Sequence, residues 1–157
     1  MTSTDRFQVV PAAYVVLRRT VDGQEQVLLQ LRAGTGYLDD HWATAAAGHV
    51  EAGESVFEAA AREAAEELGI TIDHAALVPL CAMHRTVEPH GPVDERVDFF
   101  LECHRWSGEP RRVESGKTAD LRWFPLDALP DPVVPHELQV LGTLGREPLP
   151  PIVTHGF

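Results

Sequence analysis

Three glutamates near the end of one predicted helix are the residues of this chain best suited to chemistry. Glu63, Glu66 and Glu67 belong to the run GHVEAGESVFEAAAREAAEELGI, which extends from Gly48 to Ile70. An α-helix turns about 100° per residue, so the three carboxylates share an arc of roughly 100°. Like charges at this spacing repel each other, and the negative end of the helix dipole disfavours them further. A bound cation would offset this repulsion, so the three carboxylates are a candidate metal site.

The carboxylate spacing favours Mg²⁺, with Mn²⁺ as a substitute. Mg²⁺ prefers oxygen ligands and keeps several waters. Glu63 and Glu67 are four residues apart and can reach one ion from one helix face, whereas Glu66 can bind a second ion or orient a water. Mg²⁺ acts as a Lewis acid and lowers the pKa of bound water. Without a cation, we expect crowding to raise the pKa values of these carboxyl groups.

The predicted helix has clear ends. Ser55 and Glu58 fit a capping box, and Gly69 is a typical C-terminal stop. Arg62 can pair with Glu58 or Glu66, each four residues away. Glu54 lies outside the carboxylate arc and is interpreted as structural. The apolar stripe that anchors this helix consists of Phe57, Ala60, Ala61, Ala64 and Leu68.

The remaining elements must position this helix. Residues 8–19 and Gln26–Leu31 read as two strands joined by a turn at Asp22-Gly23. A loop at Arg32–Asp40 and a mostly extended segment at His41–Val50 follow. Further strands are predicted at Ala76–Met83, Val97–Cys103 and Asp120–Phe124, and a short C-terminal helix begins with Pro135 at its first position and has Leu138, Leu141 and Leu144 on one side. This order predicts an α/β fold in which a mixed sheet has helices on both sides.

Length and composition limit the class of protein. The 157 residues suit one domain, and the net charge of −11 argues against a nucleic-acid or anionic-membrane binder. A phosphate substrate is compatible with this charge, because Mg²⁺ can bridge acidic side chains and an anion. Cys81 and Cys103 are interpreted as buried free thiols. The chain has no apolar run of transmembrane length, and we expect a cytoplasmic protein.

The run resembles the Nudix box of the Nudix (MutT-like) hydrolases, and the wider resemblance covers about residues 8–145. The positions that carry it are Gly48, Glu54, Arg62, Glu63, Glu66, Glu67, Gly69 and Ile70. Two departures occur. Ala64 is smaller than the usual bulky aliphatic residue, and Ala45-Ala46-Ala47 precedes Gly48 where the family usually has a Pro-Gly-Gly that ends at the box.

The resemblance implies a Nudix α/β/α sandwich and assigns roles to named residues. Glu63, Glu66 and Glu67 would be metal ligands together with the carbonyl of Gly48, and Arg62 would orient a catalytic glutamate. A Trp-x-Gly-Glu-Pro turn, here Trp106–Pro110, precedes a glutamate that helps to activate water or bind metal in some members. Glu114 takes that position.

Substrate contacts are predicted at four residues. His84 and Arg85 follow a strand, with His90 nearby, and they are candidates to line the substrate pocket. Arg32 and Tyr37 are candidates to meet a base or a phosphate, whereas Trp42 is interpreted as core. Some family members bind a purine through an asparagine for which we identify no equivalent; His136 falls near that place but would need another hydrogen-bond pattern.

The favoured function is Mg²⁺-dependent hydrolysis of a nucleoside diphosphate linked to another moiety. The Trp-x-Gly-Glu-Pro turn hints at nucleoside triphosphates, including oxidised ones, while ADP-ribose, nucleotide sugars and dinucleoside polyphosphates stay open. An isomerase of the isopentenyl diphosphate type would need a catalytic cysteine, and neither Cys81 nor Cys103 lies near the box. A nucleotide-binding regulator without turnover is a third hypothesis. The expected partner is a small-molecule nucleotide, and a homodimer is as compatible with the sequence as a monomer.

Overall fold

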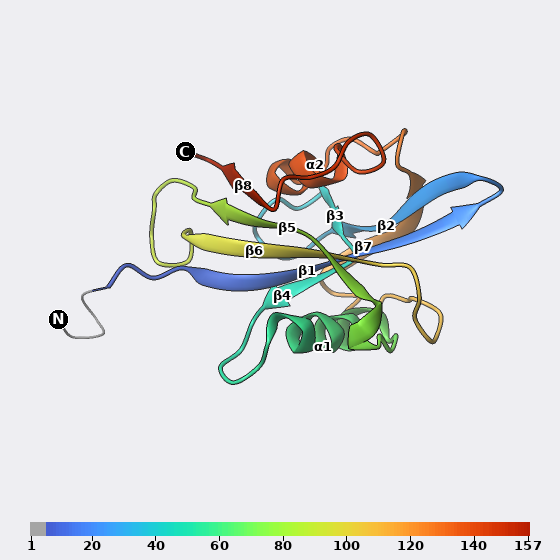
Figure 1. Cartoon of the computed structure of the whole chain (residues 1–157), viewed down its shortest axis with the longest axis horizontal. Coiled ribbons are helices and arrows are strands. Elements are labelled where there is room, and N and C mark those ends of the chain that lie inside the picture. The colour runs from blue at the N-terminus through green and yellow to red at the C-terminus, as the bar shows by residue number, and fades with distance from the viewer. Residues whose placement is uncertain (1–5) are drawn as a thin grey trace.

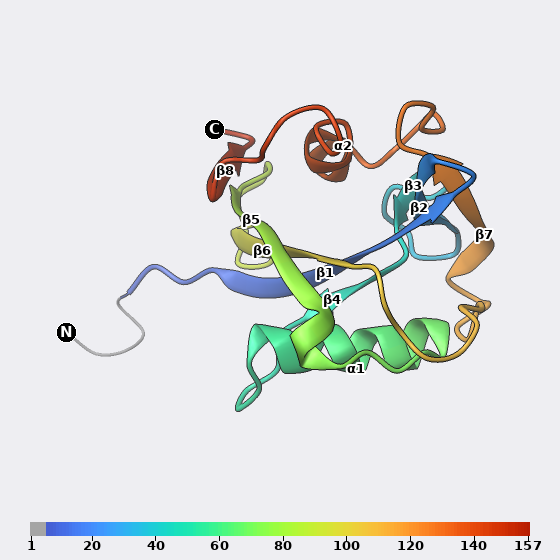
Figure 2. The same cartoon turned by 45° about the vertical axis from the view of Figure 1, so that its right-hand side comes forward.

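The computed structural model describes residues 6–157, which form one mixed sheet with a helix on each side (Figures 1 and 2). The sheet has the order β3-β2-β1-β6-β5-β8, with β4 paired to β1 and β7 paired to β2. The strands are β1 (Val10–Val21), β2 (Gln24–Arg32), β3 (Trp42–Thr44), β4 (Ala46–His49), β5 (Leu77–Arg85), β6 (Arg96–Cys103), β7 (Thr118–Pro125) and β8 (Ile152–His155). The helices are α1 (Val56–Leu68), α2 (Pro135–Leu141) and the short 3₁₀ helix η2 (His74–Ala76). The predicted fold class is confirmed.

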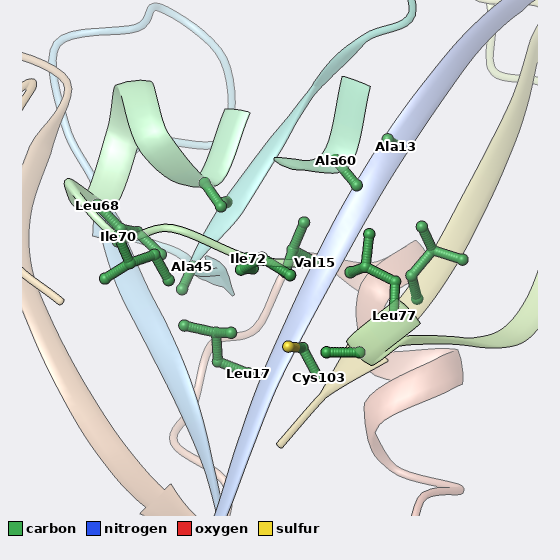
Figure 3. Packing of buried hydrophobic residues seen from close by; sticks show 14 of the residues in the cluster. Ala13, Val15, Leu17, Ala45, Ala60, Leu68, Ile70, Ile72, Leu77 and Cys103 are labelled. Atoms are coloured by element: carbon green, nitrogen blue, oxygen red, sulfur yellow. The ribbon is translucent and has the colours of Figure 1, made fainter. Parts of the chain in front are cut away.

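Strand β1 organises both halves of the core. Its first part pairs with β4 and in parallel with β6, and its last four residues pair with β2. Because successive strand residues face opposite sides of a sheet, β1 supplies two separate clusters. Ala13, Val15 and Leu17 face α1, where they pack with Ala60, Leu68 and Ile70 (Figure 3), whereas Ala12, Tyr14 and Val16 join the cluster that contains Val140 and Leu141 of α2.

The turn between β1 and β2 is the predicted hairpin. Asp22 and Gly23 have φ values of 50° and 77°, and Val21 pairs with Gln24. Two consecutive positive φ values are typical of a type I′ turn, whose twist matches that of the flanking strands. Strand β1 begins and ends two residues later than predicted. Strand β2 begins two residues earlier and ends one residue later than predicted.

Helix α1 begins and ends as predicted. The Ser55 hydroxyl accepts the Glu58 N–H at 3.1 Å, and the Glu58 carboxylate accepts the Ser55 N–H at 2.6 Å. Gly69 closes the helix with a φ of 68°. Glu58 is therefore committed to the cap, which is why the predicted pair between Arg62 and Glu58 does not form.

Of the three leucines predicted to lie on one side of the C-terminal helix, Leu141 and Leu144 are buried and Leu138 is exposed. Pro135 does occupy its first turn, but Leu138 is 43% exposed and Leu144 lies beyond the last helical residue. The buried residues of this helix are His136, Glu137, Val140 and Leu141. The neighbouring sheet decides which face is covered, and in this seven-residue helix the covered face includes two polar side chains.

Two elements were not predicted, namely η2 and strand β8. Strand β8 pairs in parallel with β5 and forms one edge of the sheet.

Cys81 and Cys103 are buried free thiols, as expected. Trp42 is also in the core as expected, since it is 9% exposed and packs against Phe124. No helix between residues 6 and 157 combines the length and the apolar composition that crossing a bilayer requires.

Candidate active site

The last turn of α1 lies against strand β4 and brings two of the three glutamates out of solvent. The Glu67 carboxylate accepts the N–H of Ala47 at 2.8 Å, and the Glu63 side chain is 13% exposed. The Glu63 carboxyl group occupies the space that a Cβ atom on Gly48 would fill. A side chain at position 48 would therefore displace the Glu63 carboxyl group from this position. Glu66 is exposed at the surface of the same turn.

Burial is the main cause that raises the pKa values of both carboxyl groups, and the like-charge crowding expected from the sequence contributes a smaller part. The pKa of Glu67 rises to about 8, because burial outweighs its hydrogen bond from Ala47, and the charges of Glu63, Glu114 and Glu66 raise it further. The pKa of Glu63 also rises through burial, although the adjacent Arg62 partly opposes the rise. A raised pKa means that the surroundings stabilise the ionised carboxylate poorly. A divalent cation bound beside it would stabilise that ionised form.

The donor set fits a hard divalent cation in its chemistry. Carboxylate oxygens and a backbone carbonyl are the ligands that Mg²⁺ uses in proteins. The side chains are nevertheless not assembled into a closed cage, since between residues 6 and 157 no three His, Cys, Asp or Glu side chains converge on one point. Glu63 instead contacts Arg62, and Glu67 contacts the backbone of β4.

Arg62 ties the helix to the loop that enters it. Its guanidinium donates to both carboxylate oxygens of Glu54, at 3.1 and 2.7 Å, and to the carbonyl of His49 at 3.0 Å. The same group reaches Glu63 at 2.8 Å and Glu66 at 3.3 Å. The predicted pair with Glu66 is confirmed. Glu54 binds the arginine rather than the carboxylate arc, which agrees with its structural interpretation.

Glu114 is brought to the helix end by the loop between β6 and β7. The N–H groups of Arg111 and Val113 donate to the carbonyls of Leu68 and Glu67, at 3.0 and 3.2 Å. These bonds satisfy carbonyls that a helix C-terminus leaves open. Glu114 is exposed, and its charge contributes to the raised pKa values of Glu63 and Glu67. The structure therefore brings this loop glutamate close to the helical ones.

A cavity of about 410 Å³ opens beside Gly48 and Glu67. Three of the four predicted substrate residues, Arg32, Tyr37 and Arg85, line it. The Arg32 side chain donates from Nε to the backbone carbonyl of Tyr37 at 3.1 Å, which ties the arginine to the loop that carries Tyr37. His84 does not line the cavity. It neighbours Arg85 on β5 and so points to the other face of the sheet, where its ring lies 4.7 Å from that of Phe157.

The far wall of the cavity holds Glu137, which the sequence analysis missed, and His136, which it named as a candidate near the base. Glu137 of α2 lines it with 3% exposure and accepts the Thr44 N–H at 2.7 Å. His136 also lines it, and its Nε2 lies 3.1 Å from the Tyr14 hydroxyl. The chain contains no asparagine at all, so any base recognition here uses other groups. The available signal for Glu137 was its place directly after Pro135 and His136 in a predicted helix.

Comparison of the sequence with a family model and with known proteins identifies its family. The model of the NUDIX domain matches residues 9–143. Among characterised proteins, human 8-oxo-dGDP phosphatase NUDT18 is 28% identical over 139 residues, which covers 85% of this chain and 39% of the human protein. The chain thus spans about two fifths of the length of that relative, and the same holds for the mouse protein of the same name.

Solved structures share the fold described above. A MutT NUDIX hydrolase from Burkholderia pseudomallei matches with a TM-score of 0.75 and 29% identity, over 88% of this chain and 99% of that one. The NUDIX domain of Shewanella oneidensis NrtR, solved with ADP ribose, matches with a TM-score of 0.68 at 17% identity, over 90% of each chain, and shows the fold alone. These comparisons place the chain among proteins built on a NUDIX domain. The chain belongs to the Nudix family.

Proposed function

We propose that this chain is a Mg²⁺-dependent pyrophosphohydrolase that cleaves a nucleoside diphosphate linked to another moiety, including nucleoside triphosphates. One observation carries the proposal. The half-buried carboxyl group of Glu67, which has a raised pKa, borders a cavity that three arginines also line. Such a cavity suits an anionic substrate that arrives together with a cation.

The metal would be held by Glu63, Glu66 and Glu67 with the carbonyl of Gly48. When bound, it would supply charge neutralisation at the phosphates and a more acidic water. Mn²⁺ is expected to substitute, because it accepts the same oxygen ligands. Support comes from the burial of Glu63 and Glu67 against β4 and from the lack of space for a side chain at Gly48.

Each side chain of the site would have a role that follows from its position. Arg62 would keep the helix and the loop from His49 to Glu54 in register, so that the carboxylates stay aimed at the phosphates. Glu66 and Glu114 would orient the attacking water and accept its proton, since both carboxylates lie near Glu67 and remain open to solvent. Arg32 and Tyr37 would hold the nucleotide at the cavity rim.

The shape of the surface supports a substrate with a second moiety. A neighbouring hollow of about 410 Å³ shares Tyr37, Arg85, Val87 and His136 with the first cavity. A group attached beyond the diphosphate would find room there. Cys81 and Cys103 are not among the residues that line either hollow, which gives the diphosphate isomerase hypothesis no support.

A substrate panel tests this function directly. The purified chain is incubated with nucleoside triphosphates, ADP-ribose, nucleotide sugars and dinucleoside polyphosphates, with Mg²⁺, with Mn²⁺ and with chelator, and the products are identified. We expect cation-dependent release of a phosphorylated fragment and either a nucleotide or pyrophosphate, and ¹⁸O-labelled water identifies the phosphorus attacked. Tight binding of intact nucleotide after long incubation with either cation would instead favour a regulator.

A further inference from the structure

Two arginines of the cavity wall converge on one buried aspartate. Asp98 of β6 is completely buried, and its Oδ2 accepts the Nε–H of Arg85 at 2.7 Å. Its Oδ1 lies 3.7 Å from the Nε of Arg96, which is too far for a hydrogen bond. Both arginines line the cavity, whereas Asp98 is not among the lining residues. The carboxylate therefore lies behind the two guanidinium groups and holds them at the cavity wall.

These arginines keep donors that no protein group uses. The Nη groups of Arg85 make no hydrogen bond within residues 6–157, although only 7% of this residue is exposed. The Nε of Arg96 is buried and also lacks a partner in that part of the chain. Its Nη1 makes one long contact, to the carbonyl of Val93 at 3.5 Å. Buried donors of a charged group are costly unless something accepts from them, so the pair favours a ligand with several acceptor atoms.

The charges around the arginine pair do not cancel. Two guanidinium groups face the single carboxylate of Asp98, and the nearby His136 adds no charge, because burial lowers its pKa to about 2. Two other carboxyl groups of this cavity are engaged. Glu137 accepts a backbone N–H of β3 and has a pKa that burial raises to about 7, and Asp94 accepts a backbone N–H of its own loop at 2.8 Å. A surplus positive charge therefore remains between the two arginines.

The arginine pair lies away from the expected diphosphate site. Strand β4, which carries Gly48, and strand β6, which carries Asp98, pair with the same part of β1 and so lie on its opposite edges. Two strand spacings separate them, which is about 10 Å across the sheet. Arg85 also lines the neighbouring hollow. An anion bound by the pair would therefore belong to a part of the substrate other than the diphosphate.

The geometry points to a subsite in which Arg85 and Arg96 bind a second anionic group of the substrate, a phosphate monoester or a carboxylate that a sugar separates from the scissile diphosphate. This inference rests on the proposed function and names a substrate class within it. Guanidinium groups bind both anions through paired N–H···O hydrogen bonds. The class comprises nucleotide derivatives with a phosphorylated ribose or an acidic sugar, because their uncharged counterparts would leave the donors unpaired.

Inorganic phosphate tests the subsite without a nucleotide. It is titrated in chelator, which prevents bridging by a cation at α1, and binding is followed by phosphorus NMR. Arg96→Gln removes one guanidinium group. Arg105→Gln is the matched control, since Arg105 is exposed and lines neither hollow. We expect wild type and the control to bind phosphate saturably and Arg96→Gln to bind it at least about tenfold more weakly. Equal binding by all three, or no saturable binding by wild type at millimolar phosphate, would overturn the subsite.

Matched substrate pairs test the subsite in the reaction. ADP-ribose is compared with its 2′-phosphate and UDP-glucose with UDP-glucuronate, so the members of each pair differ by one anionic group. With Mg²⁺, we expect wild type and Arg105→Gln to prefer a charged member by about 10- to 100-fold in kcat/KM, as for hydrogen bonds to a charged group. Arg96→Gln should lose most of that preference through KM. A preference within only one pair would identify the anion as a phosphate or as a carboxylate.

The outcomes separate this subsite from the hydrolase proposal. Equal kcat/KM within both pairs, or an unchanged preference in a folded Arg96→Gln, would overturn the subsite and leave the hydrolase proposal intact. Tighter calorimetric binding of the charged members, without hydrolysis of any nucleotide tested, would retain the subsite and reject the proposed function.

A second variant covers a failure of Arg96→Gln to fold, which thermal unfolding would detect. Arg96→Lys then replaces it, because lysine keeps the charge but lacks the planar fork of donors. The preference for the charged members should still fall, and an unchanged preference would again overturn the subsite.

Discussion

The two helices place carboxyl groups beside the same cavity, but they do so in different ways. Helix α1 has thirteen residues and a capping box, and its C-terminal half provides three glutamates within a stretch of five residues. Helix α2 has seven residues, lacks a side-chain cap, and buries Glu137 by contact with a strand 93 residues away. The first arrangement is local and the second is made by the tertiary fold.

This difference suggests a division between chemistry and stability. The carboxylates of α1 form one charged arc that any phosphate substrate would meet through a cation. The α2 side of the cavity carries Glu137 and His136, and Arg85 of β5 lines the same cavity. Changes at α1 should therefore affect turnover for every substrate, whereas changes at α2 should affect how the fold responds to pH.

Glu67→Gln should have the largest effect. The amide keeps the acceptor for Ala47 N–H, so the fold should be retained, but one ligand charge is lost. We expect kcat to fall by about 10²–10³-fold, as for the loss of one preorganised electrostatic contact. Steady-state kinetics, with circular dichroism and thermal unfolding as controls for folding, measure the effect. Turnover near wild type would remove Glu67 from the site.

The pH dependence of stability should separate Glu137 from the α1 glutamates. Burial raises the pKa of Glu137 from 4.5 to about 7, so between these values the folded state holds a proton that the unfolded state releases. The free energy of unfolding of wild type, relative to Glu137→Gln, should be highest below pH 4.5 and fall by at most about 3 kcal/mol as the pH rises through 7.

Denaturant unfolding of the two proteins between pH 4.5 and 8 provides this measurement. The difference between the curves isolates Glu137 from other titrating groups, such as the buried His136, whose pKa is lowered to about 2. A difference that does not vary with pH would show that Glu137 ionises in the folded chain as it does in water.

Arg62→Lys should have an intermediate effect. Lysine cannot hold Glu54, Glu63 and the His49 carbonyl at once, so the loop and the metal ligands should lose their register. We expect a 10–100-fold lower kcat/KM or cation affinity, the usual cost of an outer-shell change. Arg18→Lys is the control, because Arg18 also pairs with two carboxylates, away from the cavity. Equal losses in both variants would argue against a special role for Arg62.

Glu114→Gln should have the smallest kinetic effect. Its carboxylate is exposed and shares its surroundings with Glu66, so kcat should fall about tenfold, less than the ~100-fold minimum expected for a sole general base. Glu109→Gln, an exposed glutamate in the same loop, should behave like wild type. A loss of several hundredfold for Glu114→Gln would make it the principal base, and no loss would remove it from the reaction.

The features that the sequence predicted best are those that depend on residues close to each other along the chain. The α1 cap at Ser55, its end at Gly69, the hairpin at Asp22-Gly23 and most strands follow from patterns a few residues long. The grouping of Glu63, Glu66 and Glu67 on one helix turn is of the same kind, and so is the Arg62 pair with Glu66.

The sequence predicted poorly what depends on which surfaces meet. Leu138 was predicted to share one side with Leu141 and Leu144, but it is exposed while His136 and Glu137 of the same helix are buried. His84 was expected in the pocket, but strand alternation gave that position to Arg85 alone. Glu137 could not be recognised, since only its contact with Thr44 makes it a buried acceptor.

The most direct test of the central claim is a calorimetric titration of Mn²⁺ into the nucleotide-free chain, with Glu67→Gln and, as a control at an exposed glutamate, Glu147→Gln measured in parallel. If the end of α1 is a cation site, wild type and Glu147→Gln should take up the ion saturably and Glu67→Gln should bind it at least about tenfold more weakly. Equal uptake by all three proteins, or no uptake by wild type at millimolar Mn²⁺, would contradict the account.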